Sequence, residues 1–392
     1  MENRDWYIKT LNEISSKIGD GLHGTPKYSN NGEYFFINGN NLVNGAIVFK
    51  QDTKKVNKEE FLKYRKELNE STIFVSINGT LGNLSFYKEE KVVLGKSAAY
   101  VNLLDTVDKI FVYYNFKSKY FQNYLIDIAT GTTIPNVPLK GLREYDIQLP
   151  PLSEQKAIAG VLSSLDNKID LLHQQNQTLE ALAETLFRQW FIEEAKEDWG
   201  DCLIGDLATH SKVSIHPKKN LDTLYHHYSI PSFDANKTPV TEFGNEIQSN
   251  KYKVGINSIL FSKLNPHKDK RVWLILDEIE DNAICSTEFQ VVKPTNDKYL
   301  YFLFGWLTNS AYYNEIASGV GGTSGSHQRI DPKAIFTAPC VKIEEQIIID
   351  YNIQAEPLFR KQFENQQQIQ TLTQIRDTLL PKLMSGEVRV KY

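Results

Sequence analysis

The sequence has few or none of the features that define several classes of protein. Its three cysteines, Cys202, Cys285 and Cys340, form neither a disulfide framework nor a CxxC zinc pair. No apolar run approaches the roughly 20 residues that cross a bilayer, which excludes membrane insertion. The N-terminal stretch MENRDWYIKTLNEI lacks the apolar segment of a signal peptide, so we expect a cytoplasmic protein.

Catalytic signatures are missing as well. The sequence contains no Walker loop, no HExxH, no GxSxG, no Rossmann glycine fingerprint and no Asn/Asp-Pro-Pro-Tyr motif of amino-methyltransferases. Its eight histidines are scattered, which disfavours a metal site. We therefore predict no catalytic residue and no metal ligand on this chain.

The formal net charge of −4 counts at first against a nucleic-acid partner. Counted by region, the net charge is +2 for residues 1–151, −5 for 152–198, −1 for 199–341 and zero for 342–392. The acidity thus belongs to one segment, and the two large regions are near neutral. Such regions can carry local basic surfaces, so the overall charge does not exclude DNA.

That acidic segment, from about residue 153 to 194, is predicted to be one long helix. Its apolar residues form two columns with seven-residue spacing that alternate by four and three, which is the a/d seam of a coiled coil. Pro150 and Pro151 precede it, and Ser153 is the predicted N-cap. The seam contains Ile158, Leu162, Leu165, Ile169, Leu172, Asn176, Leu179, Ala183, Leu186 and Trp190.

A second, rougher helix is predicted from about residue 344 to 384, before Gly386, with Leu372 and Leu379 on its seam. Pro357 should kink or interrupt it. Two interpretations of Asn176 stay open: it sets the register between the helices, or it lies at a loose, exposed spot.

The aromatic cluster at the end of the first helix also has two interpretations. Its side chains dock a partner subunit, or they pack against this chain's own second helix or a neighbouring domain. The cluster consists of Phe187, Trp190 and Phe191.

The chain is predicted to be a tandem duplication. EALAETLF at 180–187 aligns with TQIRDTLL at 373–380, an offset of 193 residues. Short β-like runs with Asn-Gly turn signals, then an aromatic helical patch that ends at glycine, precede each long helix. The predicted boundaries are 1–150 for the first β-rich domain, 151–198 for the first helix, 199–341 for the second β-rich domain and 342–392 for the second helix.

Several loops in both β-rich regions mix Lys, Arg or His with Asn, Gln, Ser or Thr. Such mixtures suit phosphate contacts together with base-edge hydrogen bonds in a DNA groove. An ordinary polar surface loop explains any one of them equally well. The candidate DNA-binding residues are Lys27, Tyr28, Asn78, Lys96 and Ser97 in the first region, and Lys212, Lys218, Lys263, Asn265, Lys268, Arg271, Gln328 and Arg329 in the second.

Three segments resemble one known family. The central GTTIPNVPLKGLREYDIQLPPLSEQKAIAGVLSSLDNKIDLLHQQNQTLEALAETLFRQWF (131–191) resembles the central region of type I restriction-modification DNA specificity subunits. The opening IGDGLHGTPKYSNNGEYFFINGNNL (18–42) is similar to the start of their first target-recognition domain, and LLPKLMSGEVRV (379–390) to their C-terminus. GVGGTSGSHQRI, from residue 319, departs from the Gly-Thr-Thr-Ile-Pro-Asn form of the first repeat.

The resemblance implies a fold and a role. The fold class is α+β, with two tandem β-rich target-recognition domains separated by two long helices packed as an antiparallel coiled coil. Each recognition domain would read one half of a bipartite site in double-stranded DNA. The helices would set the spacer and dock two modification subunits.

The resemblance also implies what this chain does not supply. It would be a non-catalytic subunit of a complex with adenine-specific DNA methyltransferase and type I endonuclease activity, in which a restriction (motor-nuclease) subunit is an optional further partner. S-adenosylmethionine, ATP and magnesium are expected on partner subunits and not on this chain. Two other classes remain as alternatives: a coiled-coil protein-interaction scaffold without sequence-specific DNA binding, and an enzyme in its own right, against which the missing motifs weigh.

Overall fold

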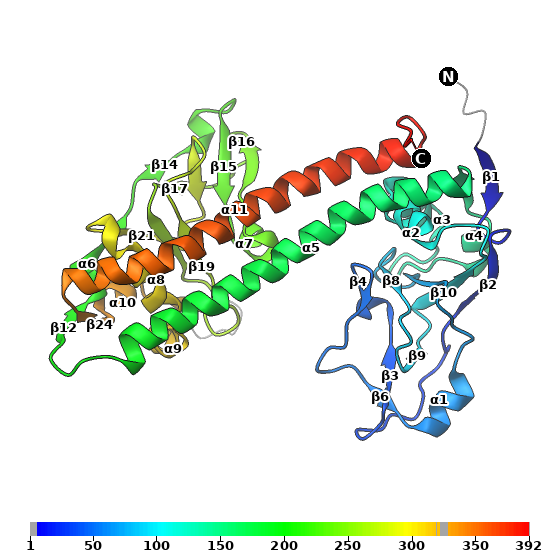
Figure 1. Cartoon of the computed structure of the whole chain (residues 1–392), viewed down its shortest axis with the longest axis horizontal. Coiled ribbons are helices and arrows are strands. Elements are labelled where there is room, and N and C mark those ends of the chain that lie inside the picture. Colours follow the sequence, from blue (N-terminus) through cyan, green and yellow to red (C-terminus); the bar gives the residue numbers. More distant parts are fainter. Residues whose placement is uncertain (1–5, 319, 322–327, 392) are drawn as a thin grey trace. The chain divides into compact units, whose positions relative to one another are not determined.

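The computed structural model describes residues 6–318, 320–321 and 328–391 (Figure 1). The chain forms two compact units: unit 1 is Met1–Ile169 with Thr371–Tyr392, and unit 2 is Asp170–Gln370. Two long helices, α5 (Leu152–Arg188) and α11 (Glu345–Met384), each pass from one unit to the other. Each unit therefore combines a β-rich part with a portion of both helices.

Unit 1 is built around a four-stranded sheet in the order β2-β10-β7-β8. Beside it lie a sheet β6-β3-β9, in which β3 and β9 are parallel, and the pairs β1-β11 and β4-β5. The strands are β1 Tyr7–Thr10, β2 Ser15–Asp20, β3 Tyr34–Ile37, β4 Leu42–Val43, β5 Ala46–Ile47, β6 Lys55–Val56, β7 Thr72–Ser76, β8 Leu84–Phe86, β9 Val92–Leu94, β10 Ala98–Leu103 and β11 Asp146–Leu149. The helices are η1 Gly39–Asn41, α1 Lys58–Tyr64, α2 Lys109–Lys117, α3 Lys119–Ile128 and α4 Leu139–Arg143.

Local sequence explains the main elements of unit 1. The central strands β7 and β10, TIFVS and AAYVNL, are buried along their whole length, as expected of strands covered on both faces. Asn44 and Gly45 have φ of 47° and 83° and join β4 to β5, which is the two-residue turn that an Asn-Gly pair favours. The aromatic patch from Val112 forms two helices, not one, because Ser118 leaves the helix and caps α3.

Unit 2 has the same plan. Its four-stranded sheet has the order β13-β21-β18-β19, next to a five-stranded sheet β14-β17-β20-β15-β16 and the pairs β12-β24 and β22-β23. The strands are β12 Gly200–Leu203, β13 Ala208–Ser211, β14 Ser214–Ile215, β15 Leu224–Tyr228, β16 Val240–Phe243, β17 Lys251–Lys253, β18 Ser258–Ser262, β19 Val272–Ile275, β20 Ala283–Cys285, β21 Phe289–Pro294, β22 Val320–Gly321, β23 Arg329–Ile330 and β24 Pro339–Lys342. The helices are η2 Gln189–Glu193, α6 Ile204–Leu207, η3 Pro217–Lys219, α7 Ile230–Asn236, η4 Asp297–Tyr299, α8 Leu300–Thr308, α9 Ser310–Ser318 and α10 Pro332–Thr337.

The two units share their main elements. The sheet β2-β10-β7-β8 corresponds to β13-β21-β18-β19, and the parallel pair β3-β9 corresponds to β15-β20. The outer pair β1-β11 corresponds to β12-β24, and the broken aromatic helix α2-α3 to α8-α9. This shared order confirms the tandem duplication.

In unit 1, α5 and α11 lie side by side and run antiparallel. Asp166 of α5 accepts a hydrogen bond of 2.9 Å from Arg376 of α11, and Glu154, earlier in α5, pairs with Arg389, which follows α11. Ile158 and Leu162 of α5 and Leu383 of α11 are buried in one core with β7, β10 and α2. Both helices thus complete the core of unit 1.

In unit 2, the same two helices again pair in antiparallel fashion. Asn365 of α11 donates a hydrogen bond of 3.0 Å to Asn176 of α5, whose own amide donates to the carbonyl of Gln362 at 3.4 Å. Farther along α5, Phe187 packs against Tyr351 near the start of α11. Every predicted seam residue is buried or half-buried: Ile158, Leu162, Leu165, Ile169, Leu172, Asn176, Leu179, Leu186, Leu372 and Leu379.

Two expectations about the helix ends and breaks are corrected. The helix α11 runs without interruption through Pro357. Pro357 and Ile353 are exposed, so the backbone carbonyl that loses its partner on that turn can bind water. Ser153 is not the N-cap of α5, because the carbonyl of Pro151 already accepts from the amides of Glu154 and Gln155.

Two helical glycines give opposite predictions for stability. An alanine Cβ at Gly305 in α8 would lie 2.0 Å from Cδ2 of Phe187, whose ring is held by Trp306 and Tyr351. Gly305→Ala should therefore lower the free energy of unfolding by about 1–3 kcal/mol through overpacking. At Gly160 in α5 an added Cβ would meet nothing within 4 Å. Gly160→Ala should therefore raise the free energy of unfolding by about 0.5–1 kcal/mol. Denaturant unfolding measures both, and equal effects would contradict the packing described.

Candidate nucleic-acid interface

In unit 1, three loops that are distant in sequence leave the central sheet at the same end. Strand β10 pairs Ala98 with Ser76 of β7 and Ala99 with Asp20 of β2. The loops 21–33, 77–83 and 95–97 therefore begin or end beside one another. They carry the candidate DNA-binding residues of this unit, which are Lys27, Tyr28, Asn78, Lys96 and Ser97.

Unit 2 presents the corresponding loops at the corresponding end of its sheet. Strand β21 pairs Phe289 with Ser262 of β18 and Val291 with Ser211 of β13. The segments after β13 and β18 carry Lys212, Lys218, Lys263, Asn265, Lys268 and Arg271. The third loop, 286–288, contributes Glu288, whose carbonyl accepts from the amide of Lys263.

A fourth segment joins these loops in each unit, just before α4 or α10. In unit 1, Asn136 forms a β-bridge with Asn78. In unit 2, Arg329 forms the equivalent bridge with Leu264, and the amide of Asn265 donates to the carbonyl of Gln328 at 2.9 Å. Residues 322–327, which precede Gln328 and Arg329, lie outside the described residues. The structure thus places most candidates of each unit on one set of four neighbouring loops, whereas Lys218 lies farther along the chain, in η3.

The candidate side chains on the loops of unit 1 differ in how exposed they are and in whether they already hydrogen-bond within the fold. Lys27 and Lys96 are exposed, and Tyr28 is 46% exposed with its ring edge against Phe36. The amide of Asn78 donates to Asn136 at 3.1 Å, which ties two loops together. The hydroxyl of Ser97 donates to Asn38 and accepts from the amide of Gly39. Ser97 therefore holds a loop in place, and its contact with DNA stays a prediction.

In unit 2, two predicted contact arginines already have carboxylate partners. The guanidinium of Arg271 is largely buried and donates to both oxygens of Asp234, at 2.5 and 2.8 Å, and to Asp269. These bonds raise the pKa of Arg271 and engage its Nε and Nη2 groups within the fold, and its contact with DNA stays a prediction. Arg329 is more exposed but makes a bidentate pair with Glu288.

The remaining candidates of unit 2 point to solvent more freely. Lys212, Lys218 and Lys268 are exposed, and Lys263 is half-buried. Asn265 adopts a left-handed backbone with φ of 48°, which Asn tolerates better than most residues and which turns the chain sharply after β18. A bound polyanion would meet these lysines first.

A histidine at the start of the predicted basic segment 210–219 is sensitive to the positive charge of this surface. His210, in β13, has its pKa lowered to about 4, mainly by burial and in smaller part by the positive charges of Lys212 and Lys263. The imidazole is therefore neutral at pH 7. Nothing in its spacing marks it in the sequence, because its environment is formed by strands far apart along the chain.

The aromatic cluster after α5 is an interior feature. Phe187 and Phe191 are 2% and 1% exposed and pack on Phe302, Tyr351 and, for Phe187, Trp306. This burial corrects their assignment as partner-docking residues and favours the self-packing interpretation. Trp190 is half-buried against Tyr351.

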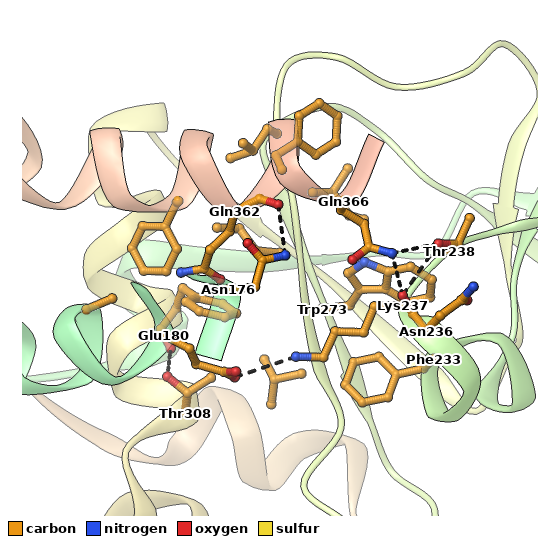
Figure 2. Close-up of a pocket in the computed structure, with 18 of the residues that line it drawn as sticks. Asn176, Glu180, Phe233, Asn236, Lys237, Thr238, Trp273, Thr308, Gln362 and Gln366 are labelled. Carbon is orange, nitrogen blue, oxygen red and sulfur yellow. Dashed lines mark hydrogen bonds and ion pairs between the residues drawn. The ribbon is translucent and has the colours of Figure 1, made fainter. Parts of the chain in front are cut away.

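Unit 2 also contains a cavity of about 510 Å³ between its helix pair and its β-rich part (Figure 2). At this boundary Gln366 of α11 donates to the carbonyl of Asn236 and to Thr238, at 2.6 and 2.9 Å. Lys237, between them, pairs with Glu180 of α5 at 3.5 Å. The turn after α7 thus binds both long helices at once.

Comparison with known proteins finds relatives of one kind. Residues 3–181 match the family model described as type I restriction modification DNA specificity domain. The chain is 28% identical over 427 residues to the type I restriction enzyme MjaIX specificity subunit of Methanocaldococcus jannaschii, which covers 99% of this chain and 94% of that protein. The chain is thus similar over its whole length to a type I restriction-modification specificity subunit, and its residues 3–181 match the DNA specificity domain of such subunits.

Two further relatives agree with this assignment. The MjaVIII specificity subunit of the same organism is 28% identical over 186 residues, covering 43% of this chain and 40% of that protein. The crystal structure of the type I restriction-modification S subunit from M. genitalium has the same fold, with a TM-score of 0.63 at 18% identity over 98% of this chain and 97% of that chain. The fold class is thus confirmed as α+β, with two β-rich target-recognition domains and two long helices.

These similarities support a role in DNA sequence specificity. Specificity subunits are non-catalytic and act in complexes with DNA and other restriction-modification subunits. Within the described residues no helix is long and apolar enough to cross a membrane. The same residues contain no group of three or more His, Cys, Asp or Glu side chains arranged to hold a metal ion.

The pKa of His210 is predicted to follow the charge of the loop surface. Lys212→Gln removes a nearby positive charge and should raise this pKa from about 4, whereas Lys218→Gln, on the same segment, should leave it unchanged. NMR titration of the imidazole measures both. Because the unfolded histidine titrates near 6.5, the wild-type chain should also lose stability as the pH falls from 6.5 toward 4. An unchanged pKa in Lys212→Gln would contradict the proximity of the two residues.

Proposed function

We propose that this chain is the sequence-specific DNA-binding subunit of a type I restriction-modification complex. Each target-recognition domain reads one half of a bipartite site in double-stranded DNA. The paired helices α5 and α11 set the length of the unread spacer between the two halves and dock modification subunits.

One observation carries this proposal: two units of one topology present the same four loops at the same end of the same sheet. A reader of two separate short motifs needs two such surfaces, as dimeric DNA-binding proteins show with their paired half-sites. Because the loops of unit 1 and unit 2 carry different side chains at equivalent places, each would recognise a different sequence. A scaffold that binds only protein gives no reason for matched lysine-bearing loops.

The loop side chains suit different tasks on DNA. Exposed lysines, which are Lys27, Lys96, Lys212, Lys218 and Lys268, fit phosphate contacts. Tyr28 in unit 1, and Lys263, Asn265 and Gln328 in unit 2, offer the polar groups that read base edges. Arg271 and Arg329 act indirectly, by holding the loops through Asp234 and Glu288.

The proposal assigns the chemistry to partners. Two modification subunits would bind S-adenosylmethionine and methylate adenine, and a restriction subunit that uses ATP and magnesium is a further partner. The near-neutral charge of each recognition domain agrees with this division, because basic partners can supply part of the phosphate neutralisation.

The proposal predicts the result of a selection from random duplexes by the assembled complex. The wild-type chain should enrich two short motifs at one fixed gap. Inserting seven residues into α5 after Asn176 and seven into α11 before Asn365 keeps the seam in register and adds about 10 Å of helix. The gap should then grow by about three base pairs, at roughly 3.4 Å each, while both motifs stay the same.

A seven-residue insertion between Lys196 and Glu197, outside both long helices, is the control and should leave the gap unchanged. Enrichment of no motif by the wild-type complex would contradict sequence-specific binding. A change in motif identity after the paired helix insertion would contradict the separate roles of helices and domains.

A further inference from the structure

The fold of unit 2 brings together two cysteines that are 138 residues apart in the sequence. Cys202 in β12 and Cys340 in β24 lie directly opposite each other in this antiparallel strand pair (Figure 1). Both are free thiols, and their sulfur atoms are 2.8 Å apart across a thiol–thiol hydrogen bond. No spacing rule predicts this pair, because only the pairing of distant strands creates it.

The positions of the two residues suit a disulfide bond. Directly opposed residues of an antiparallel pair have Cα atoms about 4.5–5.5 Å apart, and a disulfide spans about 4.4–6.8 Å between its Cα atoms. The strands β12 and β24 therefore need no rearrangement to accept the bond. Each sulfur already faces the other, so the two thiols can be joined where they stand.

The two thiols have different roles in such a reaction. Cys202 is partly exposed, whereas Cys340 is 4% exposed. Burial raises the pKa of both thiols, and the hydrogen bond between them lowers the pKa of Cys202 but raises that of Cys340 further. Because the thiolate is the nucleophile in cysteine chemistry, Cys202 is the thiol that attacks an oxidant from solvent. Cys340 is then the resolving thiol beside it.

The pair lies at the base of the β-rich part of unit 2. Strand β12 follows α5 and η2, and β24 leads into α11, so the two strands are the connections of this part to the long helices. Within the described residues they form a sheet of two strands only, which is marginal in stability on its own. A covalent bond between Cys202 and Cys340 would close the whole segment between them into one loop.

Neither the first unit nor the third cysteine offers a second site of this kind. The corresponding strands of unit 1, β1 and β11, read YIKT and DIQL and contain no cysteine. Cys285 in β20 is fully buried, and burial raises the pKa of its thiol to about 12. Oxidation of the pair would therefore change unit 2 alone.

We propose that Cys202 and Cys340 are a reversible oxidation site that takes hydrogen peroxide and closes to an intramolecular disulfide. Cys202 gives its proton to solvent, and its thiolate attacks one peroxide oxygen. The O–O bond breaks, the departing hydroxide takes up a proton to become water, and Cys202 becomes a sulfenic acid.

The second step forms the disulfide. The sulfur of Cys340 attacks the sulfur of the sulfenic acid, the S–O bond breaks, and the oxygen leaves as a second water with the proton of Cys340. In total the two thiols lose two protons and two electrons, and one peroxide becomes two waters. A small thiol reverses the bond by thiol–disulfide exchange. This site is independent of the DNA-binding role proposed above.

The test follows the thiols of the full chain before and after treatment with hydrogen peroxide. The mass of the chain should fall by that of two hydrogen atoms, and proteolysis should release one linked pair of peptides that contains Cys202 and Cys340. Cys285 should react with iodoacetamide only after unfolding. Cys202→Ser should abolish the link, whereas Cys285→Ala, the matched control, should keep it. Dithiothreitol should restore both thiols.

Thermal unfolding measures the effect of the bond on unit 2. Tryptophan fluorescence reports mainly on this unit, because four of the five tryptophans lie within it. The unfolding midpoint of the oxidised chain should rise by roughly 5–15 °C, since the disulfide restricts the unfolded chain. The midpoint should return to its first value after reduction, and peroxide should leave it unchanged in Cys202→Ser.

Other outcomes overturn the proposal. A treated chain that keeps all three thiols, or a Cys202 that gains oxygen and never bonds to Cys340, contradicts the reaction. A link between two chains through Cys202 assigns its reactivity to intermolecular contact instead. An unchanged midpoint in the linked chain, or an equal rise in Cys202→Ser, contradicts the role of the bond in unit 2.

Discussion

The pairing of α5 with α11 is the contact on which the rest of the structure depends. Neither β-rich part closes its core alone: unit 1 uses Ile158 and Leu162 from α5 and Leu383 from α11, and unit 2 uses Phe187 and Tyr351. Full burial of one such side chain contributes about 1.5–3 kcal/mol. A change that separates the helices therefore exposes apolar surface in both units. The recognition loops extend from the central sheets, and the cores of these sheets depend on the helix pairing.

The side chains on the seam between α5 and α11 differ between the units. This difference favours the pairing of each half of α5 with the half of α11 in its own unit. In unit 1, Asp166 accepts hydrogen bonds from Arg376, Lys117 and Tyr114. Burial alone would raise the pKa of Asp166, but these bonds and charges outweigh it, so the pKa is lowered and the carboxylate stays ionised. The corresponding seam positions of unit 2 are Ala183 and Phe359, which lie in an aromatic core. Pairing the wrong halves would leave a carboxylate against aromatic rings, which is costly.

Sequence patterns predicted the helices better than they predicted the site. A seven-residue period persists over many turns, so α5 and the seam were correct even though Pro357 was expected to disturb α11. The turn at Asn44 and Gly45 was also predictable, because few other pairs adopt positive φ at both positions. Local rules of this kind need only neighbouring residues.

The site depends on contacts between distant residues, which no local pattern contains. In the sequence, Arg271 has the chemistry of an arginine that reads bases. In the fold, its guanidinium donates to the carboxylate of Asp234 in α7. Ser97 and Asn78 have the right chemistry for bases, but Asn38 and Asn136 bind them within the fold. Asn136, the partner of Asn78, is the last residue of the motif GTTIPN (131–136). The position of this motif in the repeat was therefore a sequence signal for that one partner. The sequence could predict that these lysines are exposed. It could not predict that they share one surface, because that depends on how distant strands pair.

The central claim is that each unit reads its own half of the DNA site. Exchanging residues 199–341 for the corresponding domain of another specificity subunit tests it most directly, with the methylated sequence mapped by single-molecule sequencing before and after. The account predicts that one half-site changes to that of the donor, while the other half-site stays and the sequence remains bipartite. A change in both half-sites, or in neither, would contradict it.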